Sequence, residues 1–342
     1  MGGCCCFVRR KAGLSTPPLG ARVAPGPGAA AKVMLASSIV LALAAPQRIL
    51  VLGGSGFVGS HVCKALVGCG CSVRSMSRSG LQTRGAVRFD GSTPTVLERF
   101  PDESWVSQVE WLAADASGEA AVQEAVSGGI DGVVGCLGAP DKLREMSSSS
   151  WNGNRWSDES HQLYEGTFAP YRLAFGAAKA AGAERCAYVG VSEVVEMGYG
   201  GTQPGIYKAK RDAAAAARAA FGDGLTEFGP SLVVGAGDPR LKALDSGWAR
   251  GLIALNKAVG EMGYRGEDFV TRASLTPPVS VDDLALAVAA TVTGRAEVAP
   301  SERVVYANEG GPDAREVRTL GRHVDGTEAI RELARRAEAG VI

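Results

Sequence analysis

A glycine-rich turn between an apolar run and a helix-like segment constrains the fold of this chain more than any other feature. The apolar run at 48–53 ends in a glycine, and further glycines follow at positions 56 and 59. Such a pattern indicates dinucleotide binding when it follows a strand and opens a helix, as it does here. Gly53 permits the tight turn, Gly56 lets backbone amides approach a pyrophosphate, and Gly59 lets the helix pack closely against the strand. The alternative is a turn with a purely structural role.

The segments around this turn predict which residues contact the two halves of a dinucleotide. We expect the pyrophosphate to lie against the loop and first helical turn, where free N–H groups attract anions. These residues are Gly53, Gly54, Ser55, Gly56, Phe57, Val58 and Gly59. Asp115 and Ala116 follow the third predicted strand and are candidates for the adenine edge. Gly138 follows the fourth predicted strand and is expected beneath the nicotinamide ribose.

The residues after the second predicted strand favour NADP(H) over NAD(H). An acidic residue about 20 positions beyond the glycines would bind the ribose hydroxyls of NAD, but Ser77, Arg78 and Ser79 stand there. A guanidinium clamps a phosphate and stacks on aromatic rings. We therefore expect Arg78 to select NADP, the alternative being a solvated surface arginine.

Strand-like and helix-like segments alternate along the chain, which predicts an α/β protein with a doubly wound parallel Rossmann sheet. The predicted strands are 48–53, 72–77, 109–114, 132–137, 186–191, 232–234 and 302–307, and the predicted helices are 57–67, 120–126, 161–181, 206–221, 281–292 and 327–339. Ser280 is the expected N-cap of the helix that follows it. We expect three parts: a disordered targeting leader over 1–46, an NAD(P)-binding domain over 47–310 with a small C-terminal helical cap at about 238–278, and a helical tail over 311–342.

The first 48 residues contain six basic side chains and no acidic one. The chain has 36 basic and 36 acidic residues in total, so the part after residue 48 has a net charge of −6. This leader is typical of a transit peptide and predicts a mitochondrial or plastid location. The alternative is a disordered N-terminal arm without a targeting function. Its uncharged stretch at 33–47 is shorter than the roughly 20 residues of a membrane span, so we expect no transmembrane span in the mature chain. The acidic body argues against a nucleic-acid partner.

Cysteine and histidine usage gives no sign of a metal or a disulfide framework. The chain has eight cysteines and three histidines, and none of them shows metal-ligand spacing. The five cysteines beyond the leader are irregularly spaced. We therefore expect buried thiols and no metal.

Catalysis on such a fold ordinarily uses a Tyr four residues before a Lys on one helix, because the Lys lowers the pKa of the Tyr and holds the ribose. The residue four positions before Lys210 is Ile206, and Tyr207 is displaced by one residue, about 100° around the helix. Ser192, near the end of the fifth predicted strand, fits the third catalytic position. The catalytic candidates are therefore Ser192, Tyr207 and Lys210, and Lys210 is also expected to bind the ribose.

Five stretches carry a resemblance to a known family, namely residues 50–60, 77–80, 105–115, 207–211 and 275–281. The chain resembles the atypical short-chain dehydrogenase/reductases of the NAD-dependent epimerase/dehydratase type. Within this group it is most similar to the mitochondrial ubiquinone-biosynthesis accessory proteins and their plastid relatives, and more distantly to the Rossmann accessory subunit of respiratory complex I. The resemblance implies nucleotide binding by Gly53, Gly56, Gly59 and Arg78, with Lys210 at the matching lysine.

Two departures from the family pattern bear on catalysis. Relatives carry Asn-Gly-Thr where this chain has Glu-Gly-Thr at 165–167, and an Arg-Pro-Gly-like turn has become Gly-Pro-Ser at 229–231. The resemblance therefore implies a structural nucleotide, with a role in supporting quinone synthesis or an assembly.

The sequence leaves two functional hypotheses open. The first is an NADP-dependent oxidoreductase or isomerase acting on an apolar or quinone substrate, with Tyr207, Ser192 or Tyr164 as proton donor. The second is a nucleotide-binding subunit without turnover that stabilises a membrane-associated complex, which the displaced tyrosine favours. An RNA-binding role would need a basic face, which the charge of the body argues against.

Overall fold

The structure is a computed structural model. It describes residues 45–78, 80–82, 96–138, 158–193, 195–196, 204–235, 278–300, 302–306, 315–319 and 321–340. The expected leader and the expected cap at about 238–278 lie outside this part of the chain, apart from residues 45, 46 and 278.

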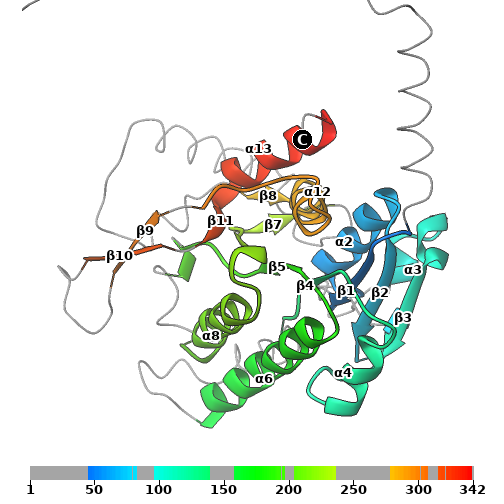
Figure 1. The fold of residues 1–342 in the computed structure, drawn as a ribbon, viewed down its shortest axis with the longest axis horizontal. Coiled ribbons are helices and arrows are strands. Elements are labelled where there is room, and N and C mark those ends of the chain that lie inside the picture. Colours follow the sequence, from blue (N-terminus) through cyan, green and yellow to red (C-terminus); the bar gives the residue numbers. More distant parts are fainter. Residues whose placement is uncertain are drawn as a thin grey trace, which may run out of the picture. The chain divides into compact units, whose positions relative to one another are not determined.

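Seven strands form one sheet in the order β11-β6-β5-β4-β1-β2-β3, and every neighbouring pair in it is parallel (Figure 1). In chain order these strands are β1 (Arg48–Leu52), β2 (Ser72–Ser77), β3 (Val109–Ala113), β4 (Gly132–Gly135), β5 (Arg185–Val189), β6 (Leu225–Gly229) and β11 (Arg322–Asp325). The strand order reverses between β1 and β4, and ligands of open α/β sheets bind in the crevice at such a point, beyond the carboxyl ends of the strands.

Helices cover both faces of the sheet because the central strands are apolar on both sides. On β1, Ile49 and Val51 pack in one buried cluster with side chains of α2, α12 and α13, whereas Leu50 and Leu52 pack in a second cluster with side chains of α4, α6 and α8. The doubly wound arrangement predicted from the sequence is therefore confirmed. The helices are α2 (Phe57–Gly68), α3 (Val96–Arg99), α4 (Glu119–Ala125), α6 (Asp158–Ala180), α8 (Pro204–Phe221), α12 (Val281–Val292) and α13 (Gly326–Glu338), with short 3-10 turns η1 (Gly80–Gln82), η2 (Ser104–Gln108) and η3 (Gly222–Gly224).

The strand predicted at 232–234 is not the one that follows β5 in the sheet. That place belongs to β6, while β7 (Val233–Val234) pairs with β8 (Val279–Ser280) in a separate small sheet. The sequence does not predict β6, because Thr226 and Glu227 interrupt its apolar residues. Thr226 is buried all the same, and the Glu227 carboxylate lies 2.9 Å from the Arg218 guanidinium.

The last part of the chain also differs from the expectation of a helical tail. Residues 311–342 include α13, but they also include β10 (Arg315–Thr319) and β11. The strand predicted at 302–307 exists as β9 (Glu302–Tyr306), and it pairs antiparallel with β10 outside the main sheet. β11 completes the main sheet although Val324 is its one apolar residue, so the periodicity of the sequence carries no strand signal there.

Within the described residues, no helix is both long enough and apolar enough to cross a membrane.

Candidate functional site

The glycine-rich loop between β1 and α2 consists of close backbone contacts that leave no room for side chains. Gly53 has a φ of 79°, and its N–H donates to the carbonyl oxygen of Met76 at 2.8 Å. A Cβ on Gly59 would lie 2.2 Å from the carbonyl oxygen of Gly53. A Cβ on Gly54 would lie 2.4 Å from Ser75 Oγ. The tight turn and the close helix–strand approach expected from the sequence are both present.

The first turn of α2 offers backbone donors rather than a side-chain cap. Its N-cap is Gly56, no side chain caps the helix, and the first turn contains no acidic residue. The N–H groups of Phe57, Val58 and Gly59 lie within the first turn, where a helix provides no carbonyl partners. The helix end carries a partial positive charge. An anion is the partner that such an end takes up, so the loop fits a pyrophosphate.

The carboxyl end of β2 lies beside this loop and carries a cation instead of an acid. Ser55 Oγ donates to Ser77 Oγ at 2.7 Å, and both side chains are buried. Arg78 follows directly and is exposed. Hydrogen bonds from Ser117, and then the charge of Arg78, hold the pKa of Asp115 below its usual range. The structure thus brings Arg78 and Asp115 to one edge of the sheet, as the sequence predicts.

Lys210 of α8 reaches the carboxyl ends of β4 and β5. Its Nζ donates to the carbonyl oxygen of Gly190 at 3.5 Å. Burial lowers the pKa of Lys210, and the nearby Cys136 opposes this shift. Two further predicted contact residues follow neighbouring strands: Ala116 is buried after β3, and Gly138 is exposed after β4. The predicted cofactor residues therefore follow the carboxyl ends of β1, β2, β3 and β4, with Lys210 reaching over from α8.

The catalytic candidates are placed less favourably. Ile206 occupies the position one turn before Lys210 and is buried, whereas Tyr207 is half-buried at the neighbouring helix position. Ser192 is also buried, and its Oγ accepts the N–H of Val195 at 3.4 Å, as a helix N-cap does. Its hydroxyl oxygen thus has a structural task at the turn that follows β5.

Tyr164 lies on α6 and contacts a face of α8 other than the one that carries Lys210. Its hydroxyl donates to Asp212 Oδ2 at 2.7 Å, and Lys208 Nζ lies 4.7 Å from the centre of its ring. Burial, and then Asp212, raise the pKa of Tyr164 to about 12. Lys208 and Asp212 each lie about 200° around the helix from Lys210, so this network faces away from the predicted ribose lysine.

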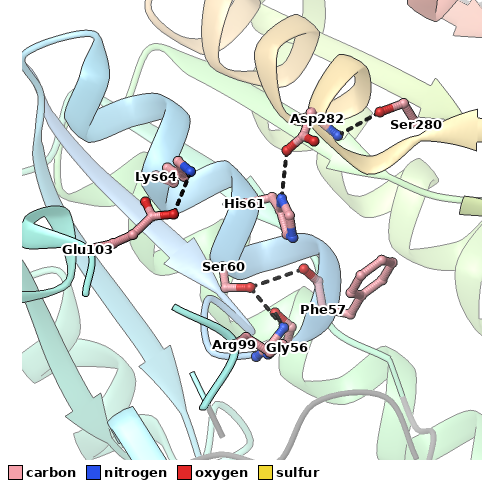
Figure 2. A network of polar contacts seen from close by, with 9 residues as sticks. All are labelled: Gly56, Phe57, Ser60, His61, Lys64, Arg99, Glu103, Ser280 and Asp282. Carbon is pink, nitrogen blue, oxygen red and sulfur yellow. Dashed lines mark hydrogen bonds and ion pairs between the residues drawn. The ribbon is translucent and has the colours of Figure 1, made fainter. Parts of the chain in front are cut away.

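Arg99 was not predicted from the sequence, yet it contacts the glycine-rich loop directly (Figure 2). Arg99 ends α3, a four-residue helix in the connection between β2 and β3. Its guanidinium donates to the carbonyl oxygens of Ser55 and Gly56 and to Ser60 Oγ. No motif or spacing singles out this residue, because only the tertiary fold brings α3 to the loop.

A second missed contact ties the start of α2 to α12. His61 is buried, and its ring makes edge contacts with the rings of Phe57 and Phe100. Its Nδ1 lies 2.8 Å from Asp282 Oδ1 (Figure 2). The hydrogen bond to His61 holds the pKa of Asp282 below its usual range. Ser280 caps α12 as predicted, since its side chain accepts the N–H of Asp282 at 3.2 Å.

Across the part of the chain that the structure describes, no three His, Cys, Asp or Glu side chains are grouped in a way that would hold a metal ion.

Comparison with known proteins agrees with this geometry. Residues 49–197 match the model of the NAD dependent epimerase/dehydratase family. The match confirms, over this segment, the family resemblance expected from the sequence. It supports a nicotinamide dinucleotide as the class of cofactor and does not distinguish NADP from NAD.

Two curated relatives match over short stretches. An uncharacterized chloroplastic protein of Arabidopsis thaliana is 41% identical over 69 residues, which is 20% of this chain and 18% of that protein. MIOREX complex component 2 of Saccharomyces cerevisiae is 32% identical over 68 residues, which is 20% of each protein. The chain thus spans about a fifth of the length of the curated relatives it matches.

The chain also resembles solved structures at low sequence identity. WbmH of Bordetella bronchiseptica in complex with NAD+ is 15% identical over 72% of each chain, with a TM-score of 0.44. The UDP-Glc/GlcNAc 4-epimerase of Campylobacter jejuni is 12% identical over 86% of this chain and 84% of that one, with a TM-score of 0.46.

Proposed function

Because residues 49–197 match the NAD dependent epimerase/dehydratase family, we propose that this protein is an organellar NADP(H)-binding subunit that retains its nucleotide without turnover. It would support quinone (ubiquinone-type) metabolism or a respiratory or other membrane-associated complex. The loop at 53–59, Arg78 and Lys210 would hold the dinucleotide. A bound nicotinamide supplies hydride-transfer chemistry when a substrate and a proton donor are also present.

The observation that carries the proposal is the position of Ile206. A proton donor must lie within hydrogen-bond reach of the reacting atom. One turn before Lys210, where this fold ordinarily places a phenol, the chain has the buried hydrocarbon side chain of Ile206, which has no acidic proton to donate. The lysine that would bind ribose is kept while the phenol is absent from that position, which favours binding without catalysis.

The preference for NADP is supported by the end of β2. An acidic side chain there would accept hydrogen bonds from the ribose hydroxyls of NAD and would repel a 2′-phosphate. Ser77 and Arg78 remove that repulsion and add a positive charge. The neighbouring Asp115 belongs to the predicted adenine edge, and its carboxylate is already held by Ser117.

The location and the partner are supported by the leader and by the relatives. The first 48 residues are basic and free of acids, as transit peptides are. One relative is described as chloroplastic, and the other is named as a component of a complex. These observations favour a mitochondrial or plastid protein that acts within an assembly.

The second candidate function is an NADPH-dependent oxidoreductase or isomerase acting on an apolar or quinone substrate. The observation in its favour is Lys210, a partly buried lysine whose pKa is lowered by burial at the ends of β4 and β5. A group of this kind can hold a ribose hydroxyl and take part in proton transfer. Tyr207, one position away from the ordinary register, would then have to supply the proton.

The two candidates are separated by nucleotide content and turnover. The full chain is purified and denatured, and any released nucleotide is identified. The native protein is then mixed with NADPH and short-chain quinones while the absorbance of the reduced nicotinamide is followed. The Tyr207→Phe variant is measured in parallel, since it removes only the phenol oxygen.

Retained NADP(H) whose redox state never changes would support the non-turnover subunit. Consumption of NADPH with quinone, lost in Tyr207→Phe, would overturn it in favour of the enzyme. A protein that releases no nucleotide and binds neither NADPH nor NADH would refute both.

A further inference from the structure

We infer that Arg99 is a second cationic determinant of NADP(H) binding, which together with Arg78 recognises the 2′-phosphate of the adenosine ribose. The inference rests on the proposed dinucleotide site and adds a residue that the glycine motif does not include. Arg99 comes from α3 in the connection between β2 and β3, whereas Arg78 directly follows β2.

The guanidinium of Arg99 lies against the outside of the glycine-rich loop. Its Nη2 donates to the carbonyl oxygen of Ser55 at 2.6 Å. Its Nη1 donates to the carbonyl oxygen of Gly56 at 3.2 Å and to Ser60 Oγ at 3.0 Å (Figure 2). These bonds hold the planar group at the start of α2, next to the backbone that would meet the phosphates.

Ser55 connects Arg99 to the carboxyl end of β2. Its carbonyl oxygen accepts from Arg99, and its hydroxyl donates to Ser77 Oγ at 2.7 Å. Ser77 is the last residue of β2, and Arg78 follows it. In addition, α3 packs against η1, the turn at 80–82. Arg78 directly follows β2, and Arg99 is linked to the same strand end through Ser55, at the place where an NAD-binding chain would carry its acidic residue.

The charge of Arg99 is maintained in this position. Burial lowers its pKa to about 10, so the guanidinium stays protonated at neutral pH. The N-terminal end of α2 beside it also carries partial positive charge. A phosphate beside both groups would be attracted by the charge of the guanidinium and by the partial charge of the helix end. Arginine suits that role because its planar donors match the oxygens of a phosphate.

The position of Arg99 along the sheet determines which phosphate of the dinucleotide it would contact. The pyrophosphate is expected over the first-turn amides of α2, whereas the ribose of the adenosine half is expected at the end of β2. Arg99 lies on the β2–β3 side of the loop and is linked through Ser55 to the end of β2. If Arg99 only held the loop in place, its loss would weaken the binding of NADPH and NADH equally. If it contacts the 2′-phosphate, its loss weakens the binding of NADPH alone.

The test compares NADPH with NADH, which differ only in the 2′-phosphate. Both are titrated into the full chain by fluorescence, for the parent protein and for Arg99→Gln, Arg99→Lys, Arg78→Gln and the Arg78→Gln/Arg99→Gln pair. The ratio of the two dissociation constants is the readout. Because both titrations use one preparation, this ratio does not depend on how much of a variant is folded.

Lys64→Gln provides the matched control. Lys64 lies on α2, the helix whose start Arg99 contacts, and its ammonium pairs with Glu103 at 2.9 Å, away from the loop (Figure 2). Removing it deletes the same charge from the same neighbourhood without deleting a contact to the loop. The ratio for Lys64→Gln should therefore stay within about twofold of the parent value, because screened surface charges contribute little.

We expect Arg99→Gln to raise the Kd for NADPH at least about tenfold and the Kd for NADH less than about threefold, as loss of a charge-assisted hydrogen bond does. Arg99→Lys should retain part of the preference, and the double variant should lose it. Equal weakening of both dinucleotides by Arg99→Gln would overturn the inference and leave the proposed site intact. A parent protein that binds both equally would overturn the inference and the NADP preference, and one that binds neither would overturn the proposed function itself.

Discussion

Replacing Gly59 with alanine sets two effects of opposite sign against each other. Alanine is favoured over glycine inside a helix by roughly 0.5–1 kcal/mol, so helix propensity alone predicts a more stable protein. In this structure the new Cβ would lie 2.2 Å from the carbonyl oxygen of Gly53 and 2.7 Å from the Cα of Gly54. Both atoms belong to the backbone and cannot rotate away, so the loop would have to move by about 1 Å to reach an ordinary contact distance.

The steric effect should outweigh the propensity. Overpacking of this kind costs typically about 1–3 kcal/mol, and contacts with rigid backbone belong to the upper part of that range, about 2–3 kcal/mol, so we expect a net loss of about 1–2.5 kcal/mol in the free energy of unfolding. For a protein of this size, with an unfolding entropy of roughly 2.1 cal/mol/K per residue, that corresponds to a fall in Tm of roughly 1–4 °C. The displaced loop should also bind NADPH more weakly, because its amides would no longer meet the pyrophosphate together.

Gly68→Ala is the matched control for this prediction. Gly68 is the last residue of the same helix, and nothing lies within 4 Å of the position of its Cβ. Only the propensity acts there, so Gly68→Ala should raise stability by up to about 1 kcal/mol and leave NADPH binding unchanged.

Denaturant unfolding and NADPH titration of both variants provide the measurement. If Gly59→Ala were as stable as Gly68→Ala, the close approach of α2 to the loop would be wrong. If Gly59→Ala lost stability but bound NADPH like the parent, the loop would not be the phosphate site.

Three further outcomes follow from particular contacts. Lys210→Met should weaken NADPH binding about tenfold, because it removes the ammonium expected to bind the ribose. It should not lower stability, because burial already disfavours the charged ammonium and lowers its pKa. NADPH titration and urea unfolding measure the two effects, and lost stability with unchanged affinity would contradict the prediction. Burial disfavours a charged His323, but Asp325 and Glu227, at 3.6 and 3.8 Å from its ring nitrogens, outweigh this and raise its pKa to about 9. Its stabilisation, about 1–3 kcal/mol, is therefore complete below the ordinary pKa of about 6.5 and is lost as the pH rises through about 9; unfolding measured from about pH 6 to pH 10 should show this fall in the parent but not in His323→Gln. Ser280→Ala should cost about 1 kcal/mol by removing the cap of α12, whereas Ser280→Asn should restore most of it; thermal unfolding distinguishes them, and equal stability of both variants would argue against the cap.

Much of the fold was predictable because its signals are local. The loop at 53–59 combines a strand end, three glycines and a helix start within a few residues, and the structure forms each of them there. The cap at Ser280 depends on the N–H two residues later, and it too was predicted. The alternation of apolar runs and amphipathic helices likewise indicated a parallel sheet covered on both faces.

The errors lie where a strand depends on its neighbours rather than on its own pattern. β6 contains Thr226 and Glu227, and β11 contains Val324 as its one apolar residue. These segments become strands because β5 and β6 offer them backbone partners at the edge of the sheet. A sequence window cannot contain this information, since the partner strand lies far away along the chain.

The sequence by itself determined the glycine loop, the doubly wound class, the cation after β2 and the displaced Tyr207, because each depends on residues that are close together in the chain. Only the tertiary structure decided that Arg99 meets Ser55, that His61 meets Asp282, and that Lys210 lies over Gly190. These contacts join separate elements, and their geometry depends on how helices pack on a common sheet rather than on any local preference of the backbone.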